Sequence, residues 1–156
     1  MNYYTLTILL GLIAIVNCTV VDKCPNSNAP KLDPADVQIS SCPDKKCILR
    51  RKTRAEITMK FTPDDDYETL TQDIQGKILD VPLPFPGVYG TPACPYIFAE
   101  DGTTKVGCPV KKGTTYVYKN GFDILPIYPT VSVVVHWGLS AGKKDAACFE
   151  ISARIK

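Results

Sequence analysis

The sequence contains few of the residues on which catalytic and metal sites depend. Its 156 residues include one histidine, His136, which falls on the outward face of a predicted strand. A Ser-His-Asp triad or a zinc site built on histidine needs partners that this pattern does not supply. The acidic run Asp64–Asp66 lacks the glycine and the distal glutamate of a calcium-binding loop, and it is typical of a solvated turn. We therefore expect no enzyme, no metal site and no cofactor.

Charge of one sign is also scarce. The chain has 18 Lys and Arg against 16 Asp and Glu, a formal net charge of +2. Nucleic-acid binding requires a strongly basic face, so we expect no nucleic-acid partner. The length suits one domain. Seven cysteines are too few for a chain held together mainly by disulfides, so a hydrophobic core must provide most of the stability.

Long hydrophobic runs are absent apart from one near the N-terminus, Ile8–Val16. A bilayer span needs about 20 residues, whereas the apolar core of a signal peptide has about 7–15. We predict a signal peptide at residues 1–18 and one mature domain at residues 19–156. Cleavage after Cys18 leaves 7 − 1 = 6 cysteines, an even number suited to an oxidising compartment. A lipid-anchored Cys18 is the alternative, which the larger residue Asn17 before it disfavours.

The mature chain has the alternating pattern of strands, and no segment has the 3.6-residue apolar period of a helix. The clearest alternation lies in Arg54–Phe61, Thr130–Leu139 and Phe149–Ile155. Weaker candidates are Asp36–Ser41, Cys47–Lys52, Ile74–Val81 and Thr115–Lys119. Asp-Pro, Pro-Gly, Asp-Gly and Asn-Gly turn signals separate these segments. The sequence therefore predicts an all-β fold of about seven short antiparallel strands in two packed sheets.

A proline-rich segment, Val81–Pro86, has proline at every second position. Proline has no N–H to donate to a sheet, so we expect this segment to be stiff, extended and unpaired along one edge. It would present Leu83 and Phe85 together on one side. Two interpretations remain open: a rigid connector over the core, or a fixed lip that holds an aromatic side chain over an opening.

The six cysteines of the mature chain allow fifteen pairings. Their spacing favours two local bonds, Cys42–Cys47 and Cys94–Cys108, which leaves Cys24 to meet Cys148 near the C-terminus. A basic run surrounds the Cys42–Cys47 pair, and Lys45 and Lys46 are expected at an exposed hairpin tip. The run consists of Lys45, Lys46, Arg50, Arg51, Lys52 and Arg54. A solvated edge is the simpler interpretation, and contact with an anionic membrane surface is the alternative.

Several short motifs follow one another through the mature chain. They are Asp22-Lys23-Cys24, Cys42-x4-Cys47, Val81-Pro82-Leu83-Pro84-Phe85-Pro86, Cys108-Pro109, Thr115-Tyr116-Val117-Tyr118, Tyr128-Pro129 and Cys148-Phe149-Glu150-Ile151. Together with the cysteine count, this order resembles the Niemann–Pick type C2 branch of the MD-2-related lipid-recognition (ML) domain family. The resemblance implies a secreted immunoglobulin-like sandwich whose two sheets part to hold a sterol, a fatty acid or another lipid.

The resemblance also implies where that lipid would bind. Phe85, with Leu83 beside it, would form the mouth of the pocket together with Ile124, Tyr128 and Pro129. The residues implied to line the interior are Met59, Phe61, Val133, Val135, Trp137 and Phe149. Two features depart from vertebrate sterol carriers of the family and resemble arthropod members. The Cys94–Cys108 segment is longer, which would reshape the entrance, and His136 replaces an acidic residue.

We therefore predict a lipid-binding and transfer protein, monomeric, whose partner is a hydrophobic small molecule and which makes transient contact with a membrane surface or membrane receptor. A lipid-dependent innate-immune co-receptor and a solid immunoglobulin-like adhesion domain are the alternatives. Family members that reach lysosomes through mannose-phosphate tags need a glycan, but no Asn-x-Ser/Thr site lies within residues 19–156. Secretion to the extracellular space is thus preferred, with the lysosomal lumen second.

Overall fold

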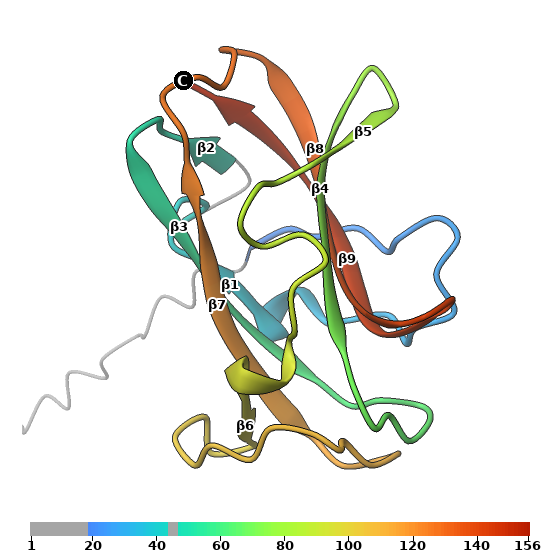
Figure 1. The fold of residues 1–156 in the computed structure, drawn as a ribbon. Coiled ribbons are helices and arrows are strands. Elements are labelled where there is room, and N and C mark those ends of the chain that lie inside the picture. Colours follow the sequence, from blue (N-terminus) through green and yellow to red (C-terminus); the bar gives the residue numbers. More distant parts are fainter. Residues whose placement is uncertain (1–18, 44–46) are drawn as a thin grey trace, which may run out of the picture.

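The structure is a computed structural model, and it describes residues 19–43 and 47–156 (Figure 1). The expected signal peptide and the expected hairpin tip at Lys45 and Lys46 lie outside the described residues. Two sheets face each other across a common core. Two short 3-10 turns, η1 (Pro34–Asp36) and η2 (Cys94–Tyr96), are the only helical elements in the described ranges.

The two sheets contain nine strands among the described residues, and each strand is hydrogen-bonded to at least one neighbour. The four-stranded sheet has the order β1 (Val37–Ile39), β3 (Thr53–Phe61), β7 (Tyr116–Ile124) and β6 (Ile97–Ala99). The five-stranded sheet has the order β2 (Cys47–Leu49), β9 (Lys144–Ile155), β8 (Ser132–Ala141), β4 (Thr71–Ile78) and β5 (Val81–Pro84). The predicted all-β sandwich is thus confirmed, with two more short strands, β5 and β6, than the sequence pattern indicated.

Alternation in the sequence correctly predicts which strand faces are buried. On β3 the buried residues include Ile57, Met59 and Phe61, and on β8 they include Val133, Val135, Trp137 and Leu139. On β9, Phe149, Ile151, Ala153 and Ile155 are buried. Alternate residues point to opposite faces of a strand, so each of these sets lines the space between the sheets.

One strand pair differs from the antiparallel expectation. β2 pairs with β9 in parallel, with Cys47 opposite Ala153. The chain leaves β1 in one sheet, turns at the Cys42–Cys47 disulfide, and adds β2 to the edge of the other sheet before returning to β3. This double crossing is short, and it places β2 alongside the last residues of β9.

The proline-rich segment joins the sheet by one edge only, as predicted. A two-residue turn at Leu79 and Asp80, both with positive φ, brings β5 back along β4, with Pro82 opposite Lys77 and Pro84 opposite Gln75. Backbone hydrogen bonds alternate along an antiparallel strand, so proline at every second position fits an edge strand whose free side faces away from β4.

Candidate functional site

The residues expected to line a pocket meet between the two sheets. Nine of the eleven side chains belong to one cluster of apolar residues. The buried ones are Met59, Phe61, Phe85, Ile124, Val133, Val135, Trp137 and Phe149, and Tyr128 packs against them while partly buried. Leu83 and Pro129 are exposed. The fold thus places the buried members of the expected set between the two sheets, with Leu83 and Pro129 at the surface.

An aromatic stack forms the centre of this region. Phe85 lies against Phe122, with ring centroids 4.5 Å apart, and against Tyr128 at 5.8 Å. Trp137 continues the stack, 5.7 Å from Phe122 and 6.2 Å from Tyr118. Contacts of this geometry stabilise by more than their buried area alone.

Phe122 was missed because the sequence contains a misleading turn signal. Asn120-Gly121 is a typical hairpin turn, so the predicted strand ended at Lys119, but β7 continues to Ile124. The glycine serves a different purpose here: a Cβ on Gly121 would lie 2.5 Å from the carbonyl oxygen of Ala55. The glycine therefore lets β7 pass close to β3, and the alternation Tyr118, Asn120, Phe122 could have indicated the longer strand.

Phe85 and Tyr128 are more enclosed than the sequence suggested. An open lip is one of the two interpretations of this segment, but Phe85 is only 5% exposed and its N–H donates to the carbonyl of Ile74 at 3.1 Å. Leu83 is 49% exposed, because it lies on the outermost strand. The hydroxyl oxygen of Tyr128 is buried as well.

Two polar atoms within this apolar region are buried without partners. The Tyr128 hydroxyl and Trp137 Nε1 make no hydrogen bond to any described residue. Burial, followed by the charge of Asp123, raises the pKa of Tyr128, so the phenol stays neutral and can donate. Because buried polar groups are usually hydrogen-bonded, these two atoms are candidates to meet a polar group of a guest molecule.

A buried glutamine connects the two sheets beside the stack. Gln72 of β4 is 1% exposed. Its Oε1 accepts from the hydroxyl of Tyr118 and, at 2.7 Å, from Asn120 Nδ2. Its Nε2 donates to Thr91 Oγ1 at 2.6 Å. Burial raises the pKa of Tyr118, which keeps this network neutral. No sequence pattern predicts this network, because one polar residue in a strand pattern does not reveal its partners.

The three disulfides have the expected pairing: Cys24–Cys148, Cys42–Cys47 and Cys94–Cys108. The Cys94–Cys108 segment carries η2 and β6 and lies at the end of the sandwich opposite the Leu79–Asp80 turn (Figure 1). The expectation that this segment reshapes the pocket entrance stays a prediction.

The charged groups outside the core form surface contacts. Asp65 pairs with Lys144 at 2.7 Å and Asp66 with Lys111 at 3.1 Å. These contacts lower the pKa of both carboxyls, through hydrogen bonds from Lys144 to Asp65 and from the backbone of Lys112 to Asp66. The acidic run is thus a salt-bridged turn.

A groove of about 510 Å³ lies on the outer face of the five-stranded sheet. Its walls include Ile48, Leu79, Val134 and Arg154. Val134 alternates with the inward-facing residues of β8, so this groove is separate from the inter-sheet region. None of the helices among the described residues is long and apolar enough to cross a membrane.

Comparison with known proteins agrees with this architecture. Residues 19–155 match the sequence model of a family described as E1_DerP2_DerF2: ML domain. The chain belongs to the ML domain family. Within it the protein is of the Niemann–Pick type C2 kind, as its relatives indicate.

Three relatives illustrate this placement of the ML-domain protein. It is 35% identical over 121 residues to the ecdysteroid-regulated 16 kDa protein of Manduca sexta, covering 76% of this chain and 78% of that protein. It is 28% identical over 123 residues to NPC intracellular cholesterol transporter 2 of Bos taurus, covering 78% and 76%. The crystal structure of a Niemann-Pick type C2 protein from Japanese carpenter ant superposes with a TM-score of 0.70 at 31% identity, covering 88% of this chain and 99% of that one.

Proposed function

We propose that this ML-domain protein is a secreted, non-enzymatic carrier that holds one sterol or long-chain fatty acid between its two sheets. The observation that carries the proposal is the aromatic stack between the sheets, which ends at Phe85 and Tyr128 and includes two buried polar atoms without a partner among the described residues. An apolar interior with a few placed polar groups is the usual composition of a lipid or cofactor site. The relative described as a cholesterol transporter supports the same class of ligand.

Entry of a lipid requires the sheets to part near Phe85. The Phe85 ring packs on Gly76, and Tyr128 lies beside it. Few backbone hydrogen bonds hold the chain near Phe85 and Tyr128. The reason is that β5 is an edge strand and the segment after Ile124 is a loop until β8 begins at Ser132. Rotation of Phe85 and Tyr128 would open the apolar region without breaking a central strand pair.

The same end of the molecule supports a membrane contact during loading and release. Leu79 is 94% exposed and Ile127 is 82% exposed, and both lie in turns at the upper end of the sandwich in Figure 1. The cations Lys77, Arg154 and Lys156 line the groove that includes Leu79. Exposed apolar side chains with cations beside one of them suit contact with an anionic membrane surface.

The single tryptophan, Trp137, allows a direct test. Because its indole is buried within the proposed site, a bound fluorescent sterol should receive energy from it, and an unlabelled lipid should reverse the signal at one ligand per chain. Extraction of the purified protein followed by mass spectrometry should recover stoichiometric lipid.

The alternatives give different results in these assays. A solid adhesion domain would carry no lipid and give no saturable energy transfer. A lipid-dependent co-receptor would bind lipid but would not move it between vesicles, whereas a carrier should accelerate that transfer.

A further inference from the structure

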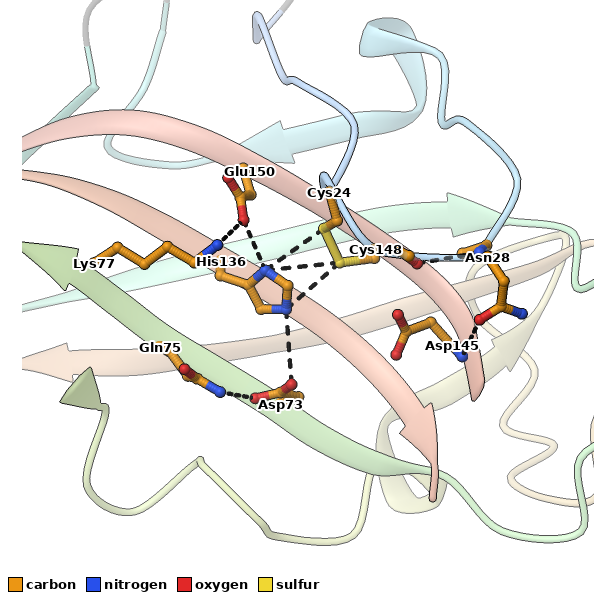
Figure 2. The surroundings of a disulfide bond; sticks show 11 residues. Cys24, Asn28, Asp73, Gln75, Lys77, His136, Asp145, Cys148 and Glu150 are labelled. Atoms are coloured by element: carbon orange, nitrogen blue, oxygen red, sulfur yellow. Dashed lines mark hydrogen bonds and ion pairs between the residues drawn. A yellow bond between two sulfur atoms is a disulfide. The ribbon is translucent and has the colours of Figure 1, made fainter. Parts of the chain in front are cut away.

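His136 lies against the disulfide between Cys24 and Cys148 on the outer face of the five-stranded sheet (Figure 2). Its Nδ1 is 3.6 Å from Cys24 Sγ, and its Nε2 is 3.6 Å from Cys148 Sγ. Nδ1 also faces Glu150 Oε1 at 3.0 Å, and Nε2 faces Asp73 Oδ2 at 3.7 Å. Two sulfurs, an imidazole and a carboxylate therefore converge on one point, which the sequence pattern did not indicate.

We propose that reduction of the Cys24–Cys148 bond converts this cluster into a zinc site. The ligands would be the two thiolates, Nδ1 of His136 and Oε1 of Glu150. The sulfur and nitrogen ligand atoms already lie within 4.8 Å of one another. Tetrahedral zinc, with Zn–S of about 2.3 Å and Zn–N or Zn–O of about 2.0–2.2 Å, needs S···N separations of about 3.6 Å and N···O separations of about 3.3 Å. Nδ1 of His136 lies 3.6 Å from Cys24 Sγ, 3.9 Å from Cys148 Sγ and 3.0 Å from Glu150 Oε1, which is close to these values.

The two cysteines are held side by side by contacts other than their own bond. Asp22 and Glu150 exchange two backbone hydrogen bonds of 2.8 Å each, at positions two residues from Cys24 and from Cys148. Beyond Cys24, the side chain of Asn28 accepts from the backbone N–H of Asp145 at 3.2 Å (Figure 2). Reduction would therefore leave the thiols adjacent, needing only a small rotation of each to admit an ion.

Neighbouring groups complete the coordination and balance the charge. With Nδ1 on the metal, Nε2–H of His136 would point to Asp73, the carboxylate–histidine–zinc arrangement that fixes a ligand ring. Asp73 in turn accepts from Gln75 (Figure 2). Lys77 donates to Glu150, so Zn²⁺, its two thiolates and one carboxylate, and this ammonium sum to zero formal charge, while the Asp73 carboxylate is 35% exposed and stays partly solvated. A neutral group is far less costly to bury than a charged one.

Formation of the site consumes one phosphine and one water molecule for each disulfide that is reduced. A phosphine attacks one sulfur, and water completes its conversion to the phosphine oxide while the disulfide becomes two thiols. Zn²⁺ then displaces both thiol protons, which leave to solvent.

The test uses the mature protein, treated with a water-soluble phosphine under native conditions and titrated with Co²⁺ as a coloured substitute for Zn²⁺. We expect one Co²⁺ per chain with a thiolate-to-cobalt charge-transfer band, which Zn²⁺ removes. Because the other disulfides are also reduced, the matched control is the Cys24→Ser/Cys148→Ser variant under the same treatment, which should show no such band. The oxidised protein should show none either.

Two further variants test the roles of the other ligands. Asp73→Asn should weaken metal binding by roughly 10–100-fold, the usual effect of removing an outer carboxylate, and His136→Gln should weaken it more. Asp123→Asn, an exposed carboxylate on β7, is the control and should have no effect. Equal binding by the Cys24→Ser/Cys148→Ser variant, unchanged affinity in His136→Gln, or no binding by the reduced wild type would each overturn the proposal. If the reduced chain unfolds, zinc-dependent refolding of wild type and not of His136→Gln supports the site, and its absence refutes it.

Discussion

The ring of Phe85 packs directly on Gly76, the residue that leaves room for it in β4. A Cβ on Gly76 would lie 3.2 Å from Cζ of Phe85 and 3.0 Å from Cγ2 of Val133. The absence of a side chain at this one position allows Phe85 to turn inward at the end of β5 and reach Phe122. Phe85 is therefore both a core residue and the residue nearest the proposed entrance.

Truncation of Phe85 should affect both stability and ligand binding. Because the side chain is buried, Phe85→Ala should lower the free energy of unfolding by about 3–5 kcal/mol, the range for core phenylalanines. Because apolar contact is lost, the binding of a fluorescent sterol or fatty acid should weaken by about 1–3 kcal/mol. Denaturant unfolding and ligand titration on the same variant measure the two effects. The full stability loss with unchanged affinity would mean that Phe85 only packs the core.

Removal of the Tyr128 hydroxyl should weaken the binding of polar lipids without lowering the stability of the protein. The hydroxyl is buried without a partner among the described residues, so Tyr128→Phe should leave the free energy of unfolding unchanged or raise it. A lipid that carries a hydroxyl or carboxylate should lose about 0.5–1.5 kcal/mol of affinity, whereas a hydrocarbon analogue should lose none. Equal effects on both ligands would show that the hydroxyl does not contact the polar group.

The three disulfides should differ in their contribution to stability. Loss of Cys24–Cys148 opens a loop with a sequence separation of 124, against 5 for Cys42–Cys47. The chain-entropy model gives about 5 kcal/mol for the first and about 2 kcal/mol for the second. Replacing both cysteines of the first pair by serine should thus lower the melting temperature more, as calorimetry would measure. Equal decreases would contradict the loop-length argument.

Glu150 should make stability depend on pH in the acid range. Burial opposes its ionisation, but hydrogen bonds from Lys77 and His136 outweigh this and hold the pKa of Glu150 below its ordinary value of 4.5. A lowered folded-state pKa contributes stability that is complete above about pH 4.5 and is lost as pH falls through the folded value. The stability difference between wild type and Glu150→Gln should therefore be largest near neutral pH and shrink below pH 4.5. A difference that stays constant from pH 7 to pH 3 would exclude this linkage.

The exposed tip at Leu79 should matter for lipid transfer and not for folding. Its side chain is 94% exposed, so Leu79→Ser should change the free energy of unfolding little. Transfer of a fluorescent lipid between anionic vesicles should slow several-fold, because the apolar contact with the membrane is lost. The control is Thr103→Ser, an exposed position in the loop after β6. Unchanged transfer by Leu79→Ser would remove this turn from the membrane contact.

Much of this protein was determined by local sequence pattern. Alternation identified the buried faces of β3, β8 and β9, because the two-residue period of a strand is a property of the strand itself. Cysteine spacing gave the disulfide pairing, since short separations favour local closure. An ordered series of short motifs indicated the family that the comparisons then showed.

Only the tertiary structure decided which residues meet across strands. Asn120-Gly121 lies inside β7 because that strand passes close to Ala55, a requirement that no local pattern expresses. Phe85 is buried because β4 offers Gly76 at the facing position. His136 reaches Cys24, 112 residues away, because the order of β8 and β9 and the backbone bridge at Asp22 place them together. Periodicity depends on neighbours along the chain, whereas a site depends on sheet order and register, which many residues fix together.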